Sequence, residues 1–331
     1  MYYGNLGSSD LEVSILAFGA WQLGDTPYWG ADTQAGSEAA VQAAIDAGIN
    51  LFDTAEGYGG GESERVLGRA VGSKRDKVLI ASKVSASHCA PAQLRRACEA
   101  SLERLQTDWI DLYQVHWPFR DVPFEAAYEE LHRLQEEGKI REVGVSNFGP
   151  RDLDDWMAHG HCVSNQVGYN LAFRAIEHEV VPACLKYNAG ILAYMPLFQG
   201  ILAGRWAAPN AIPEARRRTR HFSSDRPGVR HGEPGCEALL FDTLSKLEDV
   251  AANLGEPLAN VSLAWVMAQP GVTSVLLGAR NPAQLERNLG AANLKLDEET
   301  LTQLDTATKP LKEALGKNAD MWCGGQNARI R

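Results

Sequence analysis

The sequence predicts an α/β fold, a closed (β/α)8 barrel of parallel strands with an N-terminal β-hairpin and long loops at the face where the strands end. The first observation is a set of apolar, often β-branched runs, which begin near Ile15, Ile49, Val78, Ile110, Glu142, Val163, Gly190 and Val272. The second is that helical patterns fill nearly all the gaps between them. Strict alternation implies a parallel sheet with right-handed crossovers, and eight such units close naturally into a barrel.

The length of the chain fits one barrel. At 331 residues it exceeds the usual size of a domain, yet barrels of this type routinely reach this length as one unit. With 45% hydrophobic residues, the chain has ample material for a core. We therefore expect a single domain over residues 1–331.

Two short segments precede the first barrel strand. Residues 2–6 and 11–13 are separated by Gly7-Ser-Ser-Asp10, a sequence typical of a turn. We expect the two segments to pair as a hairpin that plugs the bottom of the barrel.

The segment 123–138 shows the helical pattern most clearly. A proline opens it and Gly138 supplies its stop. Its apolar side chains share one face: Phe124, Tyr128, Leu131 and Leu134. Segments 91–106 and 241–254 show the same pattern, so helices are expected over all three.

A doubly wound open sheet is the alternative architecture. It would require a Gly-x-Gly-x-x-Gly turn directly after an early strand, with an acidic residue about 20 residues further on. The glycine-rich stretch 57–61 does not have that spacing. The barrel is therefore favoured.

Two segments interrupt the alternation of strands and helices. Residues 205–235 carry prolines and a cluster of arginines, and two interpretations of this loop stay open, a lid at the barrel mouth and a solvated surface excursion. If it is a lid, it would fold as a clasp over a ligand bound at the barrel mouth. Residues 309–331 form a tail in which glycines interrupt any helix. Trp322 in this tail indicates docking over the barrel mouth, and a frayed end is the alternative.

Composition argues against several classes of partner and site. The net charge of -10 argues against a general affinity for phosphate backbones, so nucleic acid is not an expected partner. The six cysteines form no Cys-x-x-Cys pair, so neither structural zinc nor a disulfide framework is indicated. The N-terminus lacks the pattern of a secretory signal, and the longest apolar stretch, 191–204, is too short to span a bilayer. We expect a cytoplasmic protein without a membrane partner.

Polar side chains mark the ends of three successive strand-like runs. Asp53 closes the first of these runs, and Tyr58 follows it within one glycine-rich loop. Lys83 closes the next run and His116 the one after. Because the strand ends of a parallel barrel open onto one face, we expect these four side chains to converge there.

The arrangement of these four residues resembles the catalytic tetrad of the aldo-keto reductases, and the resemblance runs almost the length of the chain. Residues 48–68 are similar to the family's first signature. Residues 105–118, which end in His116-Trp117-Pro118, resemble its second, and residues 138–148 resemble its third.

The four residue types suit carbonyl reduction, which needs a hydride on carbon and a proton on oxygen. Tyr58 would donate the proton, and Lys83 would lower its pKa toward neutrality. A buried lysine tends to lose its own proton, and Asp53 would keep it charged by pairing with it. His116 would orient the carbonyl oxygen. Taken singly, each residue has a structural explanation; together they favour catalysis.

The resemblance implies a nicotinamide cofactor, NADP(H), held without a dinucleotide-binding domain of the Gly-x-Gly-x-x-Gly type. In relatives, side chains equivalent to Ser146, Asn147 and Gln166 hold the carboxamide, and Tyr194 would stack on the nicotinamide. The family's loop beneath the pyrophosphate is matched by Leu197, Gly200 and Leu202.

The run that begins at Gly278 leads from the last strand into a helix. Backbone amides at a helix start and a guanidinium make an anion site. The resemblance assigns Arg280 and Gln284 to the 2′-phosphate and Asn288 to the adenine. This favours NADP(H) over NAD(H).

Four aromatic residues in strand-to-helix loops could wall an apolar pocket above the cofactor: Trp21, Trp29, Trp117 and Phe119. For Trp117, packing is an equal alternative. Such a pocket suits aldehydes and ketones. The subgroup that the chain resembles adds sugar-type or polyol substrates and small aromatic aldehydes.

The leading hypothesis is an NADP(H)-dependent oxidoreductase that interconverts a small aldehyde or ketone and its alcohol. One alternative is a cofactor-binding regulatory subunit resembling the potassium-channel β-subunits, against which the intact tetrad argues. Another is a metal-dependent barrel hydrolase, which would need several His and Asp ligands at strand ends. Among the eight histidines, His116 alone closes a strand-like run.

Overall fold

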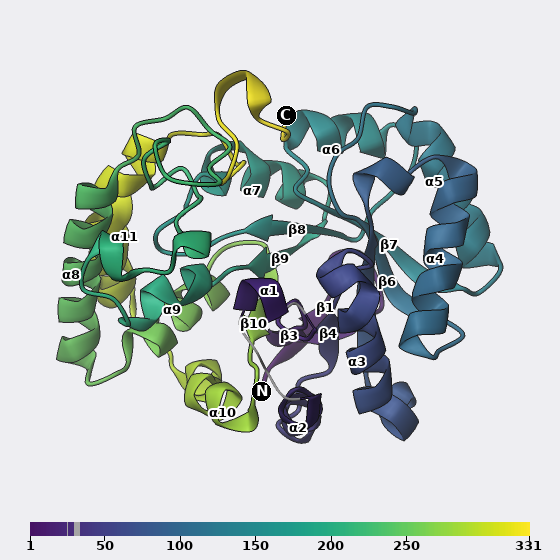
Figure 1. Cartoon of the computed structure of the whole chain (residues 1–331), viewed down its shortest axis with the longest axis horizontal. Coiled ribbons are helices and arrows are strands. Elements are labelled where there is room, and N and C mark those ends of the chain that lie inside the picture. The colour runs from purple at the N-terminus through teal and green to yellow at the C-terminus, as the bar shows by residue number, and fades with distance from the viewer. Residues whose placement is uncertain (25, 30–33) are drawn as a thin grey trace.

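A computed structural model describes residues 1–24, 26–29 and 34–331, and its centre is a closed barrel of parallel strands (Figure 1). The order around the barrel is β10-β3-β4-β5-β6-β7-β8-β9, so each strand lies beside its neighbour in sequence and β10 closes the ring on β3. The strands are β3 (Leu16–Gly19), β4 (Leu51–Asp53), β5 (Leu79–Val84), β6 (Ile110–Val115), β7 (Ile140–Ser146), β8 (Ser164–Gly168), β9 (Gly190–Tyr194) and β10 (Val272–Gly278). The predicted barrel is confirmed.

Helices cover the outside of the barrel, except the short α1, which lies at the barrel mouth (Figure 1). They are α1 (Thr26–Trp29), α2 (Gln34–Asp46), α3 (Glu62–Val71), α4 (Pro91–Leu105), α5 (Phe124–Glu136), α6 (Pro150–Met157), α7 (Ile176–Lys186), α8 (Glu237–Leu254), α9 (Leu258–Met267), α10 (Pro282–Leu289) and α11 (Glu298–Leu315). Two of the three expected helices, α4 and α5, match their bounds closely, whereas α8 begins at Glu237, earlier than expected. On α5, the buried face includes Phe124, Leu131 and Leu134, so amphipathic packing against the strands explains the helix.

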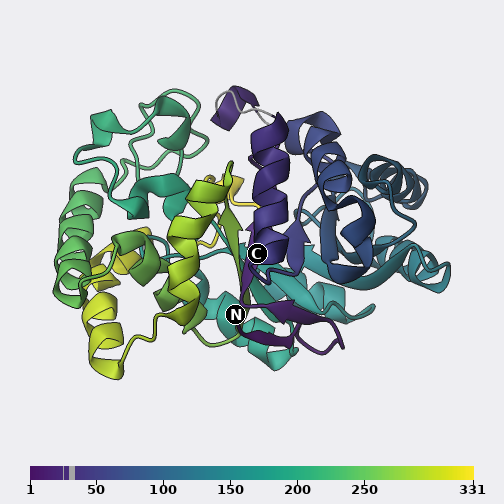
Figure 2. The same cartoon turned by 90° about the horizontal axis from the view of Figure 1, so that it is seen from below.

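The N-terminal hairpin is confirmed as well. Strand β1 (Tyr3–Asn5) pairs antiparallel with β2 (Glu12–Ser14). Leu6 and Val13 are fully buried and pack with side chains from inside the barrel, among them Leu51 and Leu112. Figure 2 shows the hairpin beside the N-terminus. The hairpin therefore seals the end of the barrel at which the strands begin.

The strand register places the polar residues of the opposite end. Asp53, the last residue of β4, lies beside Ala81 of β5, and Lys83 lies beside Gln114 of β6. Because side chains alternate along a strand, Ala81 and Lys83 face the same way. The register thus brings Lys83 one step above the level of Asp53, on the inside of the barrel.

The loop 205–235 and the C-terminal tail lie side by side, as the green and yellow segments of Figure 1 show. The backbone N–H of Arg220 donates to Met321 O (2.9 Å), and its guanidinium donates to Leu315 O (2.7 Å) and Asn318 O (3.0 Å). The irregular tail is shorter than expected, because α11 continues to Leu315 before Gly316, at φ +65°, ends it.

We predict that Leu6→Ala lowers the free energy of unfolding by about 2–5 kcal/mol, because it opens a cavity in the inner core of the barrel. Urea denaturation monitors the change. The matched control is Tyr2→Ala, whose side chain is 57% exposed and whose loss should cost no more than about 0.5 kcal/mol. Equal losses in both variants would contradict the inner-core assignment.

Candidate active site

The site is built around an ion pair inside the barrel. Lys83 is fully buried, and its Nζ donates to Asp53 Oδ2 (2.6 Å) and Thr54 O (2.8 Å). Burial lowers the pKa of Lys83, but the charge and hydrogen bond of Asp53, together with Tyr58, outweigh it and raise the pKa above its ordinary value. Lys83 therefore remains an ammonium ion.

Tyr58 lies at the exposed side of this pair. Its hydroxyl is 3.3 Å from Lys83 Nζ, which also lies 4.8 Å from the centre of the phenol ring. The expectation that Lys83 brings the tyrosine pKa down toward neutrality is wrong in this structure. Burial raises the pKa of Tyr58, and Lys83 lowers it without compensating fully. Tyr58 thus keeps its proton at neutral pH.

His116 packs edge-on to Tyr58, with ring centroids 5.6 Å apart. Burial lowers the pKa of His116 to about 3, and the positive charges of Lys83 and Arg329 act in the same direction. The ring is therefore neutral at neutral pH. A neutral imidazole has one N–H, which can donate to a carbonyl oxygen.

Asp53 has two further partners, of which the sequence analysis missed one. Gln166 Nε2 donates to Asp53 Oδ1 (2.7 Å), and Gln114 Nε2 donates to the same atom (3.2 Å). Gln114 is fully buried on β6, two residues before His116. A polar residue on the same face of a buried strand as His116 is the signal that could have found it. Both oxygens of the carboxylate are thus hydrogen-bonded.

A group of connected polar side chains follows at the ends of β7, β8 and β9, and we name it the amide-binding group after the role expected for it. Asn147 Nδ2 donates to Ser146 Oγ and to His116 O (both 3.0 Å), and the Tyr194 hydroxyl donates to Asn147 Oδ1 (2.8 Å). Ser146 Oγ donates to Gln166 O (2.9 Å). These residues, expected to hold the carboxamide, form one connected group next to His116.

The backbone after β9 is strained. Met195, Phe198 and Gln199 have φ values of 55°, 46° and 57°, in the left-handed region that residues other than glycine rarely adopt. Each such residue costs about 1–3 kcal/mol, and such strain persists where the surroundings impose it. Asn170 Nδ2 holds Met195 O (3.0 Å), and Gln199 Nε2 donates to the Tyr28 hydroxyl (2.8 Å). The strained turn directs this loop across the barrel mouth.

The end of β10 and the start of α10 are the place where an anion site is expected. The Asn281 side chain accepts from Gln284 N and caps the helix, and Gln284 Oε1 accepts from Arg280 N (3.1 Å). Arg280 Nη1 donates to Trp29 O (2.8 Å). At Gly278, an added Cβ would lie 1.9 Å from the Gln22 amide nitrogen, so a larger residue there would displace the amide of Gln22 from this strand end.

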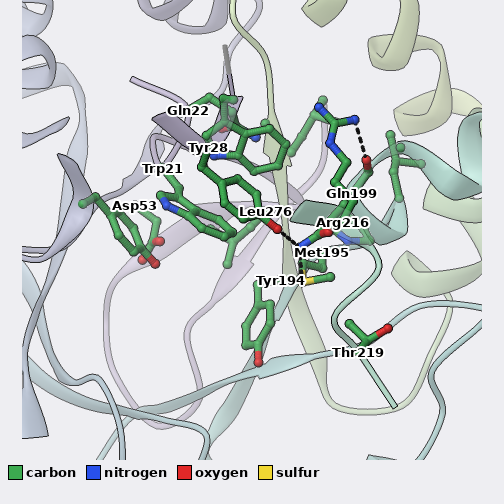
Figure 3. A pocket seen from close by; sticks show the side chains of 18 of the residues that line it. Trp21, Gln22, Tyr28, Asp53, Tyr194, Met195, Gln199, Arg216, Thr219 and Leu276 are labelled. Carbon is green, nitrogen blue, oxygen red and sulfur yellow. Dashed lines mark hydrogen bonds between the residues drawn. The ribbon is translucent and has the colours of Figure 1, made fainter. Parts of the chain in front are cut away.

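One cavity of about 900 Å³ connects these groups, from Tyr58 and His116 to Arg280. Its volume is near the upper end of ligand sites, roughly 300–1,000 Å³. Of the residues expected in the site, these line it: Asp53, Tyr58, His116, Ser146, Asn147, Gln166, Tyr194, Leu197, Gly200, Gly278, Arg280, Gln284, Asn288, Trp21, Trp29 and Trp117. Figure 3 shows Asp53, Tyr194 and Gln199 around it.

Three expected site residues do not line the cavity. Lys83 lies behind Asp53 and Tyr58. Leu202 is fully buried in the core. The prediction that Phe119 forms part of the substrate wall is wrong, because its ring is buried and packs against Phe124 (centroids 4.9 Å).

The aromatic wall includes a residue that the sequence analysis did not single out, Tyr28. Its ring stacks on Trp21 (4.9 Å) and meets Trp29 edge-on (5.1 Å). Trp21 in turn stacks on Tyr58 (5.8 Å). The Tyr28 hydroxyl donates to Ala215 O (3.1 Å), so α1 contacts the loop 205–235 across the cavity.

The C-terminal tail forms the opposite wall. Trp322 stacks on Tyr194 (centroids 6.0 Å, planes 16° apart) and meets Trp117 edge-on (6.2 Å). The Arg329 guanidinium lies 3.5 Å from the centre of the Trp117 ring and pairs with buried Asp320 (2.8 Å). Trp322 therefore docks over the barrel mouth, as one interpretation of the tail expected.

The residues present fit a nicotinamide dinucleotide. The amide-binding group offers donors and acceptors at one end of the cavity, and the capped helix start with Arg280 offers an anion site at the other. Between them, Trp29 Nε1 and Gln22 Oε1 are buried without a hydrogen-bond partner among the described residues. Such orphaned polar atoms are expected where a polar ligand completes a site.

Two other kinds of site find no support in the part of the chain that the structure describes. It contains no group of three or more His, Cys, Asp or Glu side chains placed to hold a metal ion. Nor is any of its helices both long and apolar enough to cross a membrane.

The barrel holds a buried Asp-Lys pair, with a tyrosine above the pair and a neutral histidine beside it. This arrangement is the one that the sequence analysis expected of an aldo-keto reductase. The model of the Aldo/keto reductase family matches residues 15–309. The chain belongs to this family.

Known relatives agree with the assignment. The chain is 32% identical over 321 residues to Aldo-keto reductase YhdN of Bacillus subtilis, which covers 92% of this chain and 93% of that protein. It is 27% identical to the NADH-specific methylglyoxal reductase of Escherichia coli, with 93% and 98% covered. An aldo-keto reductase from Klebsiella pneumoniae, solved in complex with NADPH, is 31% identical, with 92% and 95% covered and a TM-score of 0.72.

We predict that Asp53→Asn lowers the free energy of unfolding by about 3–5 kcal/mol at neutral pH, because it leaves a buried ammonium ion without its counter-ion. In the wild type, the pKa of Lys83 is higher in the folded protein than in the unfolded chain. Lys83 therefore contributes fully to the free energy of unfolding below the pKa of the unfolded chain, and this contribution is lost as pH rises through the pKa of the folded state. In the variant, burial lowers the pKa of Lys83, so its contribution to stability should instead increase with pH.

Urea denaturation at about pH 7 and about pH 10 measures the two slopes. The control is Asp53→Asn combined with Lys83→Met, which removes the stranded charge and should restore much of the stability at neutral pH. Parallel pH dependence in the wild type and the single variant would contradict the buried pair.

Proposed function

We propose that the protein is an NADP(H)-dependent oxidoreductase, acting as one barrel domain, that interconverts an aldehyde or ketone and the corresponding alcohol. The observation that supports it most is the position of Tyr58. Its hydroxyl lies 3.3 Å from a buried ammonium ion and faces a cavity that also holds a neutral histidine and an amide-binding group.

Tyr58 acts as the proton donor in carbonyl reduction. Its raised pKa keeps the hydroxyl protonated at neutral pH, so the acid form is the resting form. As negative charge develops on the carbonyl oxygen, the proton passes from the hydroxyl to that oxygen. The phenolate that remains is stabilised by Lys83, whose own raised pKa keeps it positive.

His116 orients the carbonyl. Because the pKa of His116 is about 3, its ring is neutral near pH 7 and carries one N–H that can donate to the carbonyl oxygen. For the same reason His116 is not a second general acid near neutral pH. Asn147, bonded to the backbone carbonyl of His116, couples the position of this histidine to the amide-binding group. The carbonyl oxygen thus meets two donors, Tyr58 and His116.

When bound, a reduced nicotinamide cofactor would supply the hydride, an electron pair with its hydrogen, that carbonyl reduction needs on carbon. Ser146, Asn147 and Gln166 would hold its carboxamide, and Leu197 and Gly200 would lie beneath its pyrophosphate. Gln166 also holds Asp53 (2.7 Å), so one side chain links the cofactor seat to the ion pair.

The preference for NADP(H) rests on Arg280 and Gln284 at the start of α10, where a 2′-phosphate would meet a guanidinium and backbone amides. The Klebsiella relative binds NADPH and the Escherichia coli relative is NADH-specific. Relatives therefore include proteins that bind either cofactor, and Arg280 supports NADP(H) for this chain.

The walls indicate the kind of substrate. Trp21 and Trp117 bracket Tyr58 and His116 with apolar surface, which suits small aldehydes and ketones, including sugar-type and small aromatic ones.

We predict that Tyr58→Phe lowers kcat for aldehyde reduction by roughly 10²–10⁴, since the general acid is lost. Turnover is followed by NADPH absorbance with 4-nitrobenzaldehyde. Binding of NADPH, measured by quenching of tryptophan fluorescence, should stay at the wild-type value. Tyr2→Phe, at an exposed position far from the site, is the control. Near wild-type turnover in Tyr58→Phe would refute the mechanism.

We predict that Arg280→Ala weakens NADPH binding by about tenfold or more, because charge-assisted hydrogen bonds to phosphate are lost. NADH binding should change little. Fluorescence titrations of the wild type, Arg280→Ala and the surface control Arg151→Ala with each cofactor give the six dissociation constants to compare. Equal wild-type affinity for NADPH and NADH would remove the NADP preference, and binding of neither would contradict the proposed reaction.

A further inference from the structure

The arginines that line the cavity fall into two groups. The first lies toward α1 and α10: Arg205, Arg216, Arg280 and Arg287. Arg216 stacks on Trp29 (5.2 Å) and lies within electrostatic reach of Arg205 and Arg280. This group stands where the phosphates of the cofactor are expected.

The second group, Arg218, Arg230 and Arg329, lies by the tail. Arg218 is two residues before Arg220, whose N–H bonds Met321 O, so this part of the loop runs beside Trp322. Arg230 lies within electrostatic reach of Cys323, the residue after Trp322. Since Trp322 stacks on Tyr194, this group borders the far side of the amide-binding group.

Two of these three arginines have no counter-charge. Arg329 is neutralised by Asp320 through two hydrogen bonds (2.8 and 2.9 Å). Neither Arg218 nor Arg230 forms a hydrogen bond or ion pair among residues 1–24, 26–29 and 34–331, and Arg218 Nε is buried with no partner. Asp53 is the one acidic side chain among the described residues that line the cavity, and Lys83 already neutralises it.

The loop is shaped to hold the Arg218 guanidinium in place. Gly228, at φ +72°, packs against it, and an added Cβ there would lie 2.8 Å from Arg218 Nε. An unpaired, half-buried guanidinium is costly unless an anion completes it. In a chain with a net charge of -10, this local excess of positive charge would attract small anions into the cavity.

We propose that Arg218 and Arg230 bind an anionic group of the substrate, so that the protein reduces aldehydes or ketones that carry a carboxylate or a phosphate. The inference rests on the proposed function and specifies its substrate class. The carbonyl would lie at Tyr58 and His116, and the chain of the substrate would pass along the cavity wall formed by Trp322 to the two guanidinium groups.

Two aldehydes of nearly equal outline test the charge preference, 4-carboxybenzaldehyde and the uncharged 4-nitrobenzaldehyde. In Arg218→Gln combined with Arg230→Gln, kcat/KM for the carboxylate should fall about tenfold or more, mainly through KM. The nitro compound should keep its wild-type value, and so should the dissociation constant of NADPH. Arg217→Gln is the matched control, since Arg217 is adjacent in the loop and does not line the cavity.

Glyceraldehyde 3-phosphate compared with glyceraldehyde distinguishes a phosphate from a carboxylate as the preferred group. If the double variant lowers kcat/KM more for glyceraldehyde 3-phosphate than for 4-carboxybenzaldehyde, each relative to its uncharged partner, the preferred group is a phosphate. If the loss is larger for 4-carboxybenzaldehyde, the preferred group is a carboxylate. Equal loss for charged and uncharged aldehydes, with weaker NADPH binding, would overturn the proposal and assign the arginines to the cofactor. Unchanged kinetics would also overturn it.

Binding without turnover separates this proposal from the proposed reaction. Calorimetry measures the affinity of 4-carboxybenzyl alcohol for the complex with NADPH, in the wild type and in the double variant. Arginine-dependent binding in a protein that reduces neither aldehyde would support the anion site and overturn the reaction. Binding that is independent of both arginines would overturn the anion site.

Discussion

The burial of one ammonium ion constrains the whole site. Lys83 has no contact with solvent, and an isolated charge at such a position would be strongly destabilising. Asp53 provides the opposite charge, Thr54 O accepts a second hydrogen bond, and Gln114 and Gln166 satisfy the other oxygen of the carboxylate. The register of β4, β5 and β6 places Asp53, Lys83 and Gln114 close together inside the barrel. The barrel therefore positions the ion pair, and the ion pair in turn stabilises the inside of the barrel.

The electrostatics of the neighbouring residues follow from this pair. Tyr58 is close enough to Lys83 for its phenolate to be stabilised, yet buried enough to remain protonated at rest. His116 feels the same positive charge and the same desolvation, and both favour its neutral form. One buried cation thus supports an acid and a neutral donor side by side.

The loops at the barrel mouth are held in place by hydrogen bonds and ring packing. Arg220 ties the loop 205–235 to the tail. The Nε2–H of buried His221 donates to Ala172 O (2.9 Å), and the ring of His221 packs on Phe198 (4.5 Å). Burial lowers the pKa of His221 to about 4, so this contact is between uncharged groups at neutral pH. The strained turn after β9 is held from both sides, which allows it to form one wall of the cavity.

The sequence by itself determined the eight strands, the hairpin and the convergence of Asp53, Tyr58, Lys83 and His116, because alternation and strand ends are local patterns that a parallel barrel converts directly into positions. What it could not determine depends on neighbours that are distant in the chain. Phe119 was expected in the pocket and is packed on Phe124, since a loop residue can turn either way. The tyrosine pKa was expected to fall and instead rises, since desolvation depends on everything packed around the ring.

Only the tertiary structure placed Gln114 on Asp53, Tyr28 across the cavity and Trp322 on Tyr194. It also divided the arginines of the cavity into a group at α10 and a group at the tail. Nothing in their spacing along the chain separates the two groups, because a long loop can bring consecutive residues to opposite ends of a site. The physical reason is that the position of a side chain at the end of a strand follows from the regular alternation of strands and helices along the chain. The contacts of a loop residue depend instead on which distant residues it packs against.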